Sequence, residues 1–321
     1  MPVDAEMIAD RRRLRRKLSF WRVVGVLALI AAVIVGGLAV AGRTPGEGQE
    51  QIARISVSGF IAGSQRMSDL FKRVADAKSV SGVVISINSP GGTTTGAEEL
   101  YQGIRQLAEK KPLVAFVDGT AASGGYITAM AADYIVARET SIVGSIGVLF
   151  QYPETSQLLE KLGVRVEEVK SAPLKAEPSP FHPASPEARA ALQNVVNDTY
   201  DWFKRLVAER RKLNDGELGT VSTGQVFNGR QSLPLKLVDQ VGGERDAIAW
   251  LEREKNVRKD LPVRDWQPRE RSRFDLWTAA AFGADALGLD TLAAGLHRIS
   301  LAAESAKLDG LLALWQPALG K

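Results

Sequence analysis

The sequence contains no cysteine and only two histidines, His182 and His297. The absence of cysteine excludes disulfide bonds, cysteine-ligated metal centres and a cysteine nucleophile. It leaves the compartment open, because an exported protein can also lack cysteine. The scarcity of histidine narrows the choice of catalytic base, because a Ser-His-Asp triad would have to use one of these two side chains.

Most of the chain also lacks an excess of charge. The formal net charge is +4 over 321 residues, and residues 1–22 alone account for it, with seven Lys and Arg side chains against three Asp and Glu. The remainder is neutral on balance, so no basic surface for nucleic acid is expected. The length of 321 residues is typical of one large or two medium domains, and the hydrophobic content of 45% is that of an ordinary globular protein.

Residues 23–41, "VVGVLALIAAVIVGGLAVA", carry no charge. As a helix they would span about 28 Å, close to the thickness of a bilayer core. The basic tail, residues 1–22, is predicted to stay cytoplasmic. We therefore expect a single-pass anchor in the inner or plasma membrane, with the globular part on the extracytoplasmic (periplasmic) side. A cleaved signal peptide is the alternative, because "AVA" at 39–41 resembles a cleavage site.

After a Gly-rich linker at 42–51, short apolar runs alternate with amphipathic segments. This pattern predicts an α/β fold with a mostly parallel sheet. The predicted strands are 52–61, 82–88, 112–119, 133–138, 141–148 and 164–170, and the predicted helices are 67–77, 95–109, 123–132, 154–163, 185–213 and 245–255. Residues 257–321 differ in composition, show no catalytic signal, and are predicted to form a helical C-terminal extension that lies outside a 52–256 core domain.

The segment "INSPGG", residues 87–92, is the first candidate for chemistry. Pro90 fixes φ, and the two glycines after it can expose backbone N–H groups. A helix begins directly afterwards, so its positive end faces the same space. Such donors could form an oxyanion hole.

The segment "GTAASGGYITAMAAD", residues 119–133, is the second candidate. Ser123 lies at a strand-to-helix turn among small residues, which leave room for a substrate backbone. The N–H of Gly124 could join the oxyanion hole. Ser89 is a competing nucleophile, but it precedes a proline and is more suited to capping the turn.

A serine nucleophile needs a group that accepts its proton. His182 lies in a Pro-rich loop and His297 lies in the C-terminal region. A lysine can also serve, provided that burial makes its amine neutral. Lys170 and Lys175, in "EVKSAPLKAEPSPF", follow a predicted strand and are the lysine candidates.

Four segments together resemble the signal peptide peptidase A family, serine proteases with a Ser/Lys dyad, in its short, single-copy form. They are "INSPGG", "GTAASGGYITAMAADYIVA", "SIVGSIGV" and "KSAPLKAEPSPF", and the resemblance covers about residues 52–250. It implies a spiral of β-β-α units like that of Clp protease and the crotonases. It also implies a homo-oligomer whose active site is shared between subunits, because the lysine of single-copy relatives comes from a neighbour.

The resemblance further implies a role for each matching residue. Ser123 would be the nucleophile and Lys175 the general base, with Ser145 orienting the lysine. The oxyanion donors would be Gly91, Gly92 and Gly124. The substrates would be cleaved signal peptides and other apolar, extended peptides at the lipid bilayer, with no metal or cofactor required. Two positions depart from the family pattern, since Ser232 replaces a small Ala and Lys236 replaces a Gly.

Two other function classes remain open from the sequence. A crotonase-type acyl-CoA enzyme would use the same N–H groups to bind a thioester oxygen, although CoA is cytoplasmic. An inactive scaffold could keep the assembly and bind membrane proteins. The intact set of Ser123, Ser145 and Lys175 favours the peptidase.

Overall fold

The computed structural model describes residues 17, 20–22, 24–25, 49–268 and 312–314. The chain divides into two compact units, Met1–Gln49 and Glu50–Lys321, and the sheet described below belongs to the second. No helix among the described residues is long and apolar enough to cross a bilayer. The predicted anchor at 23–41 lies almost entirely outside these residues, so it stays a prediction.

The α/β class predicted from the sequence is confirmed. The elements are β1 (Gln51–Ile61), α2 (Gln65–Asp76), β2 (Val80–Thr93), α3 (Thr94–Ala108), β3 (Leu113–Ala122), α4 (Gly124–Met130), β4 (Ile135–Ala137), β5 (Ile142–Gly144), α5 (Ser156–Lys161), α6 (Pro186–Arg211), α7 (Asp215–Val221), β6 (Val226–Asn228), α8 (Gly229–Ser232), β7 (Gln240–Val241), α9 (Glu244–Glu254), β8 (Val263–Trp266) and β9 (Leu312–Leu314).

The strands form one sheet in the order β6-β5-β3-β2-β1-β8. β4 lies beyond this path, between β3 and β7, and β9 pairs with the end of β2. The pairs among β1, β2, β3 and their neighbours β4, β5 and β8 are parallel, whereas β5–β6 and β2–β9 are antiparallel. In a parallel sheet the strand ends share one edge, and here the turns after β2 and β3 meet there.

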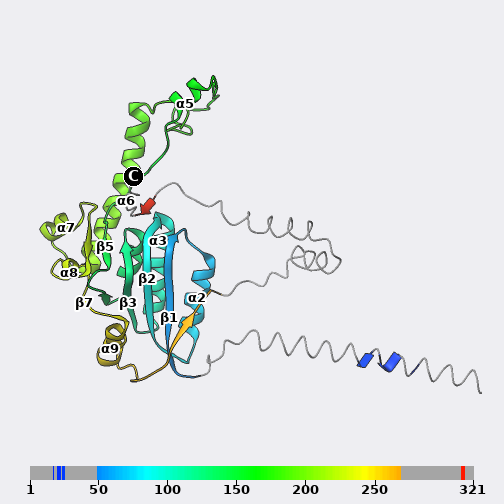
Figure 1. Cartoon of the computed structure of the whole chain (residues 1–321), viewed down its shortest axis with the longest axis vertical. Coiled ribbons are helices and arrows are strands. Elements are labelled where there is room, and N and C mark those ends of the chain that lie inside the picture. The colour runs from blue at the N-terminus through cyan, green and yellow to red at the C-terminus, as the bar shows by residue number, and fades with distance from the viewer. Residues whose placement is uncertain (1–16, 18–19, 23, 26–48, 269–311, 315–321) are drawn as a thin grey trace, which may run out of the picture. The chain divides into compact units, whose positions relative to one another are not determined.

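Both faces of the sheet are covered, as expected for parallel strands. Alternate residues of each strand point to opposite faces. One face packs beneath α2, α3, α4 and α6 through a large apolar cluster that includes Ile55, Ile85 and Tyr126. The other face packs against α9 through Val84, Phe116 and their neighbours. Figure 1 shows α9 separated from the helices that flank β1 and β2.

The region after residue 256 differs from the predicted helical extension. β8 pairs in parallel with β1, from Ile52↔Val263 to Ile55↔Trp266, so the domain's sheet continues past that boundary. β9 is a second strand in the same region. Residues 269–311, where the predicted helices fall, lie outside the described residues.

The predicted strand at 164–170 is absent from the structure, where these residues have no regular secondary structure. Val164 and Val166 alternate with charged residues as in a half-buried strand, but both, and Val169 as well, are exposed. A strand is stable only when a neighbouring strand satisfies its backbone hydrogen bonds. No such neighbour lies beside this segment in the described part of the chain.

Residues 149–185, which we call the arm, connect β5 to the long helix α6. In Figure 1 α5 lies at the end of α6 that is remote from the sheet. The arm exposes large apolar side chains that the domain core leaves uncovered. They are Leu149, Leu158, Leu162, Val164, Val166, Val169, Leu174 and Phe181.

A substitution of Gly92 tests how closely β1 and β2 must approach. A Cβ at this position would lie 1.8 Å from the carbonyl oxygen of Ile61 on β1. We expect Gly92→Ala to lower the free energy of unfolding by about 2 kcal/mol or more, because backbone must shift. Gly219→Ala is the matched control, since nothing lies within 4 Å of its new Cβ on α7. Urea denaturation should show the control to be as stable as the unmodified protein or more so. Equal stability of the two variants would contradict this account.

Candidate active site

Ser123 lies at the turn between β3 and α4 with a strained backbone. Its φ is 53° and its ψ is −117°, outside the regions that residues with a Cβ favour. Its N–H donates to the carbonyl of Gly144 at 2.7 Å, and its own carbonyl accepts from Tyr126 and Ile127 in the first turn of α4. A strained serine between a strand and a buried helix is the arrangement of a nucleophile elbow.

The small residues around Ser123 allow the helix to pack directly on backbone. A Cβ on Gly125 would lie 2.6 Å from the carbonyl oxygen of Ser89 at the end of β2. All residues of α4 are buried, and the Tyr126 hydroxyl donates to the Leu237 carbonyl at 2.8 Å. A side chain at Gly125 is therefore excluded, because the backbone at the start of α4 contacts the backbone at the end of β2.

Ser145 lies beside Ser123 because their strands are in register. Ala122 on β3 pairs with Gly144 on β5, so each serine is the next residue along its strand. Ser145 also has a positive φ, of 52°, and its N–H donates to the Gln225 carbonyl at 2.8 Å. The structure thus brings together two serines that are far apart in the sequence.

The hydroxyls of these two serines have almost no partners. The Ser123 Oγ has one long contact, 3.5 Å to the Gly147 carbonyl. The Ser145 Oγ makes no hydrogen bond among the described residues, although its residue is 92% buried. No lysine, histidine or carboxylate of those residues hydrogen bonds to either hydroxyl. The site has a candidate nucleophile, and the described part of its own chain places no base beside it.

The loop at the end of β2 uses Ser89 as a structural residue. Its side chain is fully buried, its Oγ donates to the Gly59 carbonyl at 2.6 Å, and it accepts from the Gly91 N–H at 3.1 Å. This supports the interpretation of Ser89 as a turn cap. The Gly91 N–H is engaged by Ser89 in this structure, and the oxyanion role of Gly91 stays a prediction.

Lys175 lies on the arm and not beside Ser123. It is exposed, and its ammonium makes no hydrogen bond or ion pair among the described residues. Its segment lies between α5 and the start of α6, remote from the sheet edge that carries Ser123 (Figure 1). One copy of the chain therefore does not join the predicted nucleophile to the predicted base.

Lys170, the other lysine candidate, is occupied by two carboxylates. Its Nζ lies 2.5 Å from Glu168 and 2.5 Å from Glu177. Hydrogen bonds to Glu168 and then Glu177 raise the pKa of Lys170, and hydrogen bonds to Lys170 lower the pKa of each carboxyl. A lysine held in its charged form is a poor base. The structure thus separates two lysines that the residue pattern alone left open and of which the family resemblance indicates Lys175.

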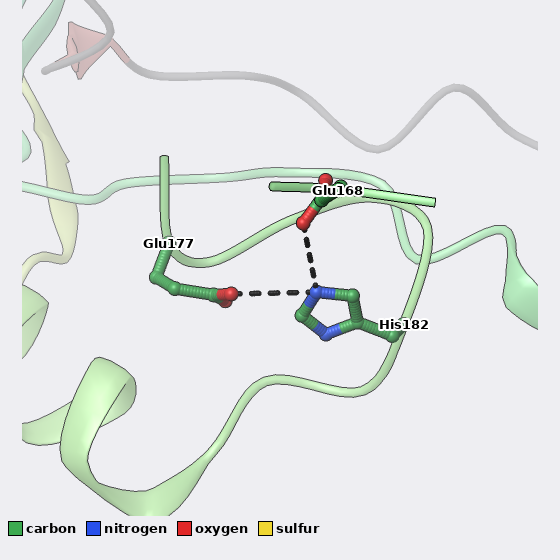
Figure 2. A group of neighbouring side chains, drawn as sticks. All are labelled: Glu168, Glu177 and His182. Carbon is green, nitrogen blue, oxygen red and sulfur yellow. Dashed lines mark hydrogen bonds and ion pairs between the residues drawn. The ribbon is translucent and has the colours of Figure 1, made fainter. Parts of the chain in front are cut away.

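His182 belongs to the same group on the arm. Its Nε2 lies 3.4 Å from Glu168 and 3.3 Å from Glu177. Figure 2 shows the His182 ring between these two carboxylates. The three side chains have the donor types of a metal site, but a metal ion would have to displace Lys170. His182 is engaged away from Ser123, and His297 lies outside the described residues.

The C-terminal end of α4 is held by two arginines that the sequence did not single out. Arg210 on α6 donates to the carbonyls of Met130 and Ala132, each at 2.8 Å. Arg105 on α3 donates to Ala131 at 2.9 Å and to Asp133 at 2.7 Å. These bonds satisfy carbonyls that a helix end leaves unpaired. They fix the helix whose other end carries Ser123.

Replacing Asp133 with Asn tests this anchor. Burial opposes ionisation of Asp133, but Arg105 and Arg210 outweigh it and lower the pKa of its carboxyl below the usual 3.8. The carboxylate therefore contributes stability above about pH 4, and this contribution is lost as pH falls through the lowered pKa. Because the group is partly exposed, we expect Asp133→Asn to cost only about 1 kcal/mol at pH 7. Urea denaturation should show this cost in unfolding free energy shrinking below pH 3.8.

The exposed Glu139, which pairs with Arg230, provides the control variant Glu139→Gln, and we expect this variant to lose less unfolding free energy. A cost for Asp133→Asn that does not depend on pH would contradict the assignment.

The chain also matches known proteases. Residues 105–258 match the model of peptidase family S49. A protein of Methanocaldococcus jannaschii named as a protease is 36% identical over 222 residues, covering 69% of this chain and 71% of its own. An Enterococcus faecium protein named as a signal peptide peptidase SppA is 34% identical, covering 66% of each chain. A solved membrane-bound stomatin-specific protease, 1510-N, covers 69% of this chain and 99% of its own, with 16% identity and a TM-score of 0.45. On the family match and the two sequence relatives, the chain belongs to peptidase family S49, the signal peptide peptidase A family, and is a serine peptidase.

Proposed function

We propose that this protein is a membrane-anchored serine endopeptidase that joins Ser123 of one copy to Lys175 of a neighbouring copy. The observation that carries the proposal is the incomplete site. Ser123 is buried and strained with no base beside it, and the exposed Lys175 has no partner, as far as the described residues go. A neighbour's arm would supply the missing group. Its exposed apolar side chains provide surface for that contact.

The proposed reaction is acyl transfer through Ser123. The neutral amine of Lys175 accepts the Ser123 proton as Oγ attacks the peptide carbonyl carbon. The N–H groups of Gly92 and Gly124 stabilise the oxyanion that forms. The lysine then gives the proton to the leaving amine, and water releases the acyl group by the same steps in reverse.

Ser145 is suited to orient the lysine. Its Oγ lies at the strand end beside Ser123 and is free among the described residues to accept from an ammonium or donate to an amine. Burial between two subunits would also favour the neutral amine. Assembly would therefore both deliver Lys175 and adjust its protonation.

The proposed substrates are extended apolar peptides, including cleaved signal peptides. Support comes from the end of β2, where β9 pairs antiparallel in the register Gly91↔Leu314, Gly92↔Ala313 and Thr93↔Leu312. An edge that accepts one peptide strand can bind another in the same way. A pocket of about 240 Å³ is lined partly by Met67 and by Phe60 and Ile61, the β1 partners of Gly91 and Gly92, and could hold an apolar side chain.

The proposed location follows from the N-terminal sequence. The apolar run at 23–41 would anchor the chain, and the basic tail at 1–22 would stay in the cytoplasm. The peptidase domain would then lie on the extracytoplasmic side, where cleaved signal peptides remain in the bilayer.

Mixing two inactive variants tests whether the site is shared. We expect Ser123→Ala and Lys175→Met each to lose at least about 100-fold in kcat with an apolar signal-peptide substrate. In assemblies formed from both variants, random mixing should pair an intact serine with an intact lysine at about a quarter of sites. Activity should therefore return in mixed assemblies of the full chain purified in detergent. Full activity of Lys175→Met would exclude this lysine as the base, and inactive mixed assemblies would exclude a shared site.

Shortening the C-terminus tests the peptide edge. Because β9 occupies the edge at Gly91–Thr93, a chain ending at residue 311 should bind peptide more tightly. We expect its KM to fall while kcat stays the same. A chain ending at Leu314 keeps β9 and is the control. An equal KM in the two shortened chains would show that substrate does not use this edge.

A further inference from the structure

The loop that carries Lys175 is closed at its base by an ion pair. Lys170 and Glu177 flank residues 171–176, and the Lys170 Nζ lies 2.5 Å from the Glu177 carboxylate. Glu168 contacts the same ammonium at 2.5 Å, so two carboxylates hold one cation. Lys175 lies within the closed loop, two residues from Glu177.

The base of this loop is more buried than its tip. The side chain of Glu177 is 8% exposed and that of Lys170 is 19% exposed. Ser179 is buried as well, and it binds both carboxylates. Its N–H donates to Glu177 at 3.1 Å, and its Oγ donates to Glu168 at 3.1 Å. A charged group that is shielded from water in this way interacts more strongly than a surface pair.

Hydrogen bonds within the loop make it compact. The N–H of Lys175 donates to the Ala172 carbonyl at 3.1 Å, and the N–H of Glu177 donates to the Leu174 carbonyl at 3.3 Å. These turns fix the backbone at Lys175 while its side chain stays exposed. The loop is therefore ordered by its own backbone hydrogen bonds and not by contacts of the Lys175 ammonium.

We propose that Glu168, Lys170 and Glu177 form a clamp that positions Lys175 for the active site of the neighbouring copy. This inference rests on the proposed function. The clamp fixes the two ends of the loop, so that docking of the arm places the Lys175 amine without further ordering of backbone. The three clamp residues are positioning residues and do not contact the reacting atoms.

Engaging the carboxylates that lie near Lys175 is a second role of the clamp. Glu177 is close to Lys175 in the chain, and a free carboxylate there would attract the Lys175 ammonium and favour its charged form. Lys170 occupies both carboxylates instead. His182 also faces them, as Figure 2 shows. The clamp thus engages both carboxylates, so that neither of them pairs with Lys175. A lysine that acts as a general base must lose its proton, and a carboxylate partner would oppose that loss.

The test compares clamp variants in the full-length, assembled protein. We expect Lys170→Met and Glu177→Gln to lower kcat about 10- to 100-fold with little change in KM, because a misplaced catalytic group slows chemistry more than binding. Lys170→Arg keeps the charge and should restore much of kcat. Asp76→Asn removes an exposed pair with Lys110 and is the control, expected to leave kcat unchanged.

Three outcomes would overturn the clamp. They are an unchanged kcat in both clamp variants, a rise in KM that accounts for the whole loss, and loss of the assembled form on gel filtration. Ser123→Ala and Lys175→Met are measured alongside. If Lys175→Met stays active, the proposed function fails first. If it is inactive while the clamp variants retain full kcat, the function stands and the clamp fails.

Discussion

The close approach of backbone to backbone around Ser123 is the constraint on which the site depends. Gly92 lies against the Ile61 carbonyl, and Gly125 lies against the Ser89 carbonyl, with no room for a Cβ at either position. Side chains are absent here because the end of β2, the turn of Ser123 and the start of α4 share one small space. The fold itself sets this limit, whatever else the glycines contribute to chemistry.

The backbone strain at the edge of the sheet that carries Ser123 has to be offset by favourable contacts elsewhere in the fold. Ser123 and Ser145 both have positive φ angles, and such a conformation costs of order 1–3 kcal/mol for each residue. The surrounding structure holds them in place, through strand register on one side and a fully buried α4 on the other. Arg105 and Arg210 hold the far end of that helix. Three helices that are separate in the sequence thus keep one serine in its unusual geometry.

The protein divides its candidate catalytic groups between a rigid core and a projecting arm. Ser123 is buried in the sheet domain, whereas Lys175 is exposed on a segment with many uncovered apolar side chains. In the proposed mechanism a single copy is inactive, because it lacks a base next to its nucleophile. Activity would then depend on assembly, which would limit cleavage to places where copies gather.

The sequence by itself determined the α/β class, most strands and helices, and the small-residue turn at Ser123, because these depend on local periodicity and on glycine. It failed at residues 164–170, where alternating valines predict a strand but no neighbouring strand is present. It could not place β8 or β9 in the sheet, since pairing joins residues far apart in the chain. The residue pattern alone left Lys170 and Lys175 open, and the tertiary structure shows the physical difference between them, because two carboxylates fold against the Lys170 ammonium. The tertiary structure also showed that the Gly91 N–H is already bound to Ser89, a hydrogen bond that the pattern "SPGG" does not reveal.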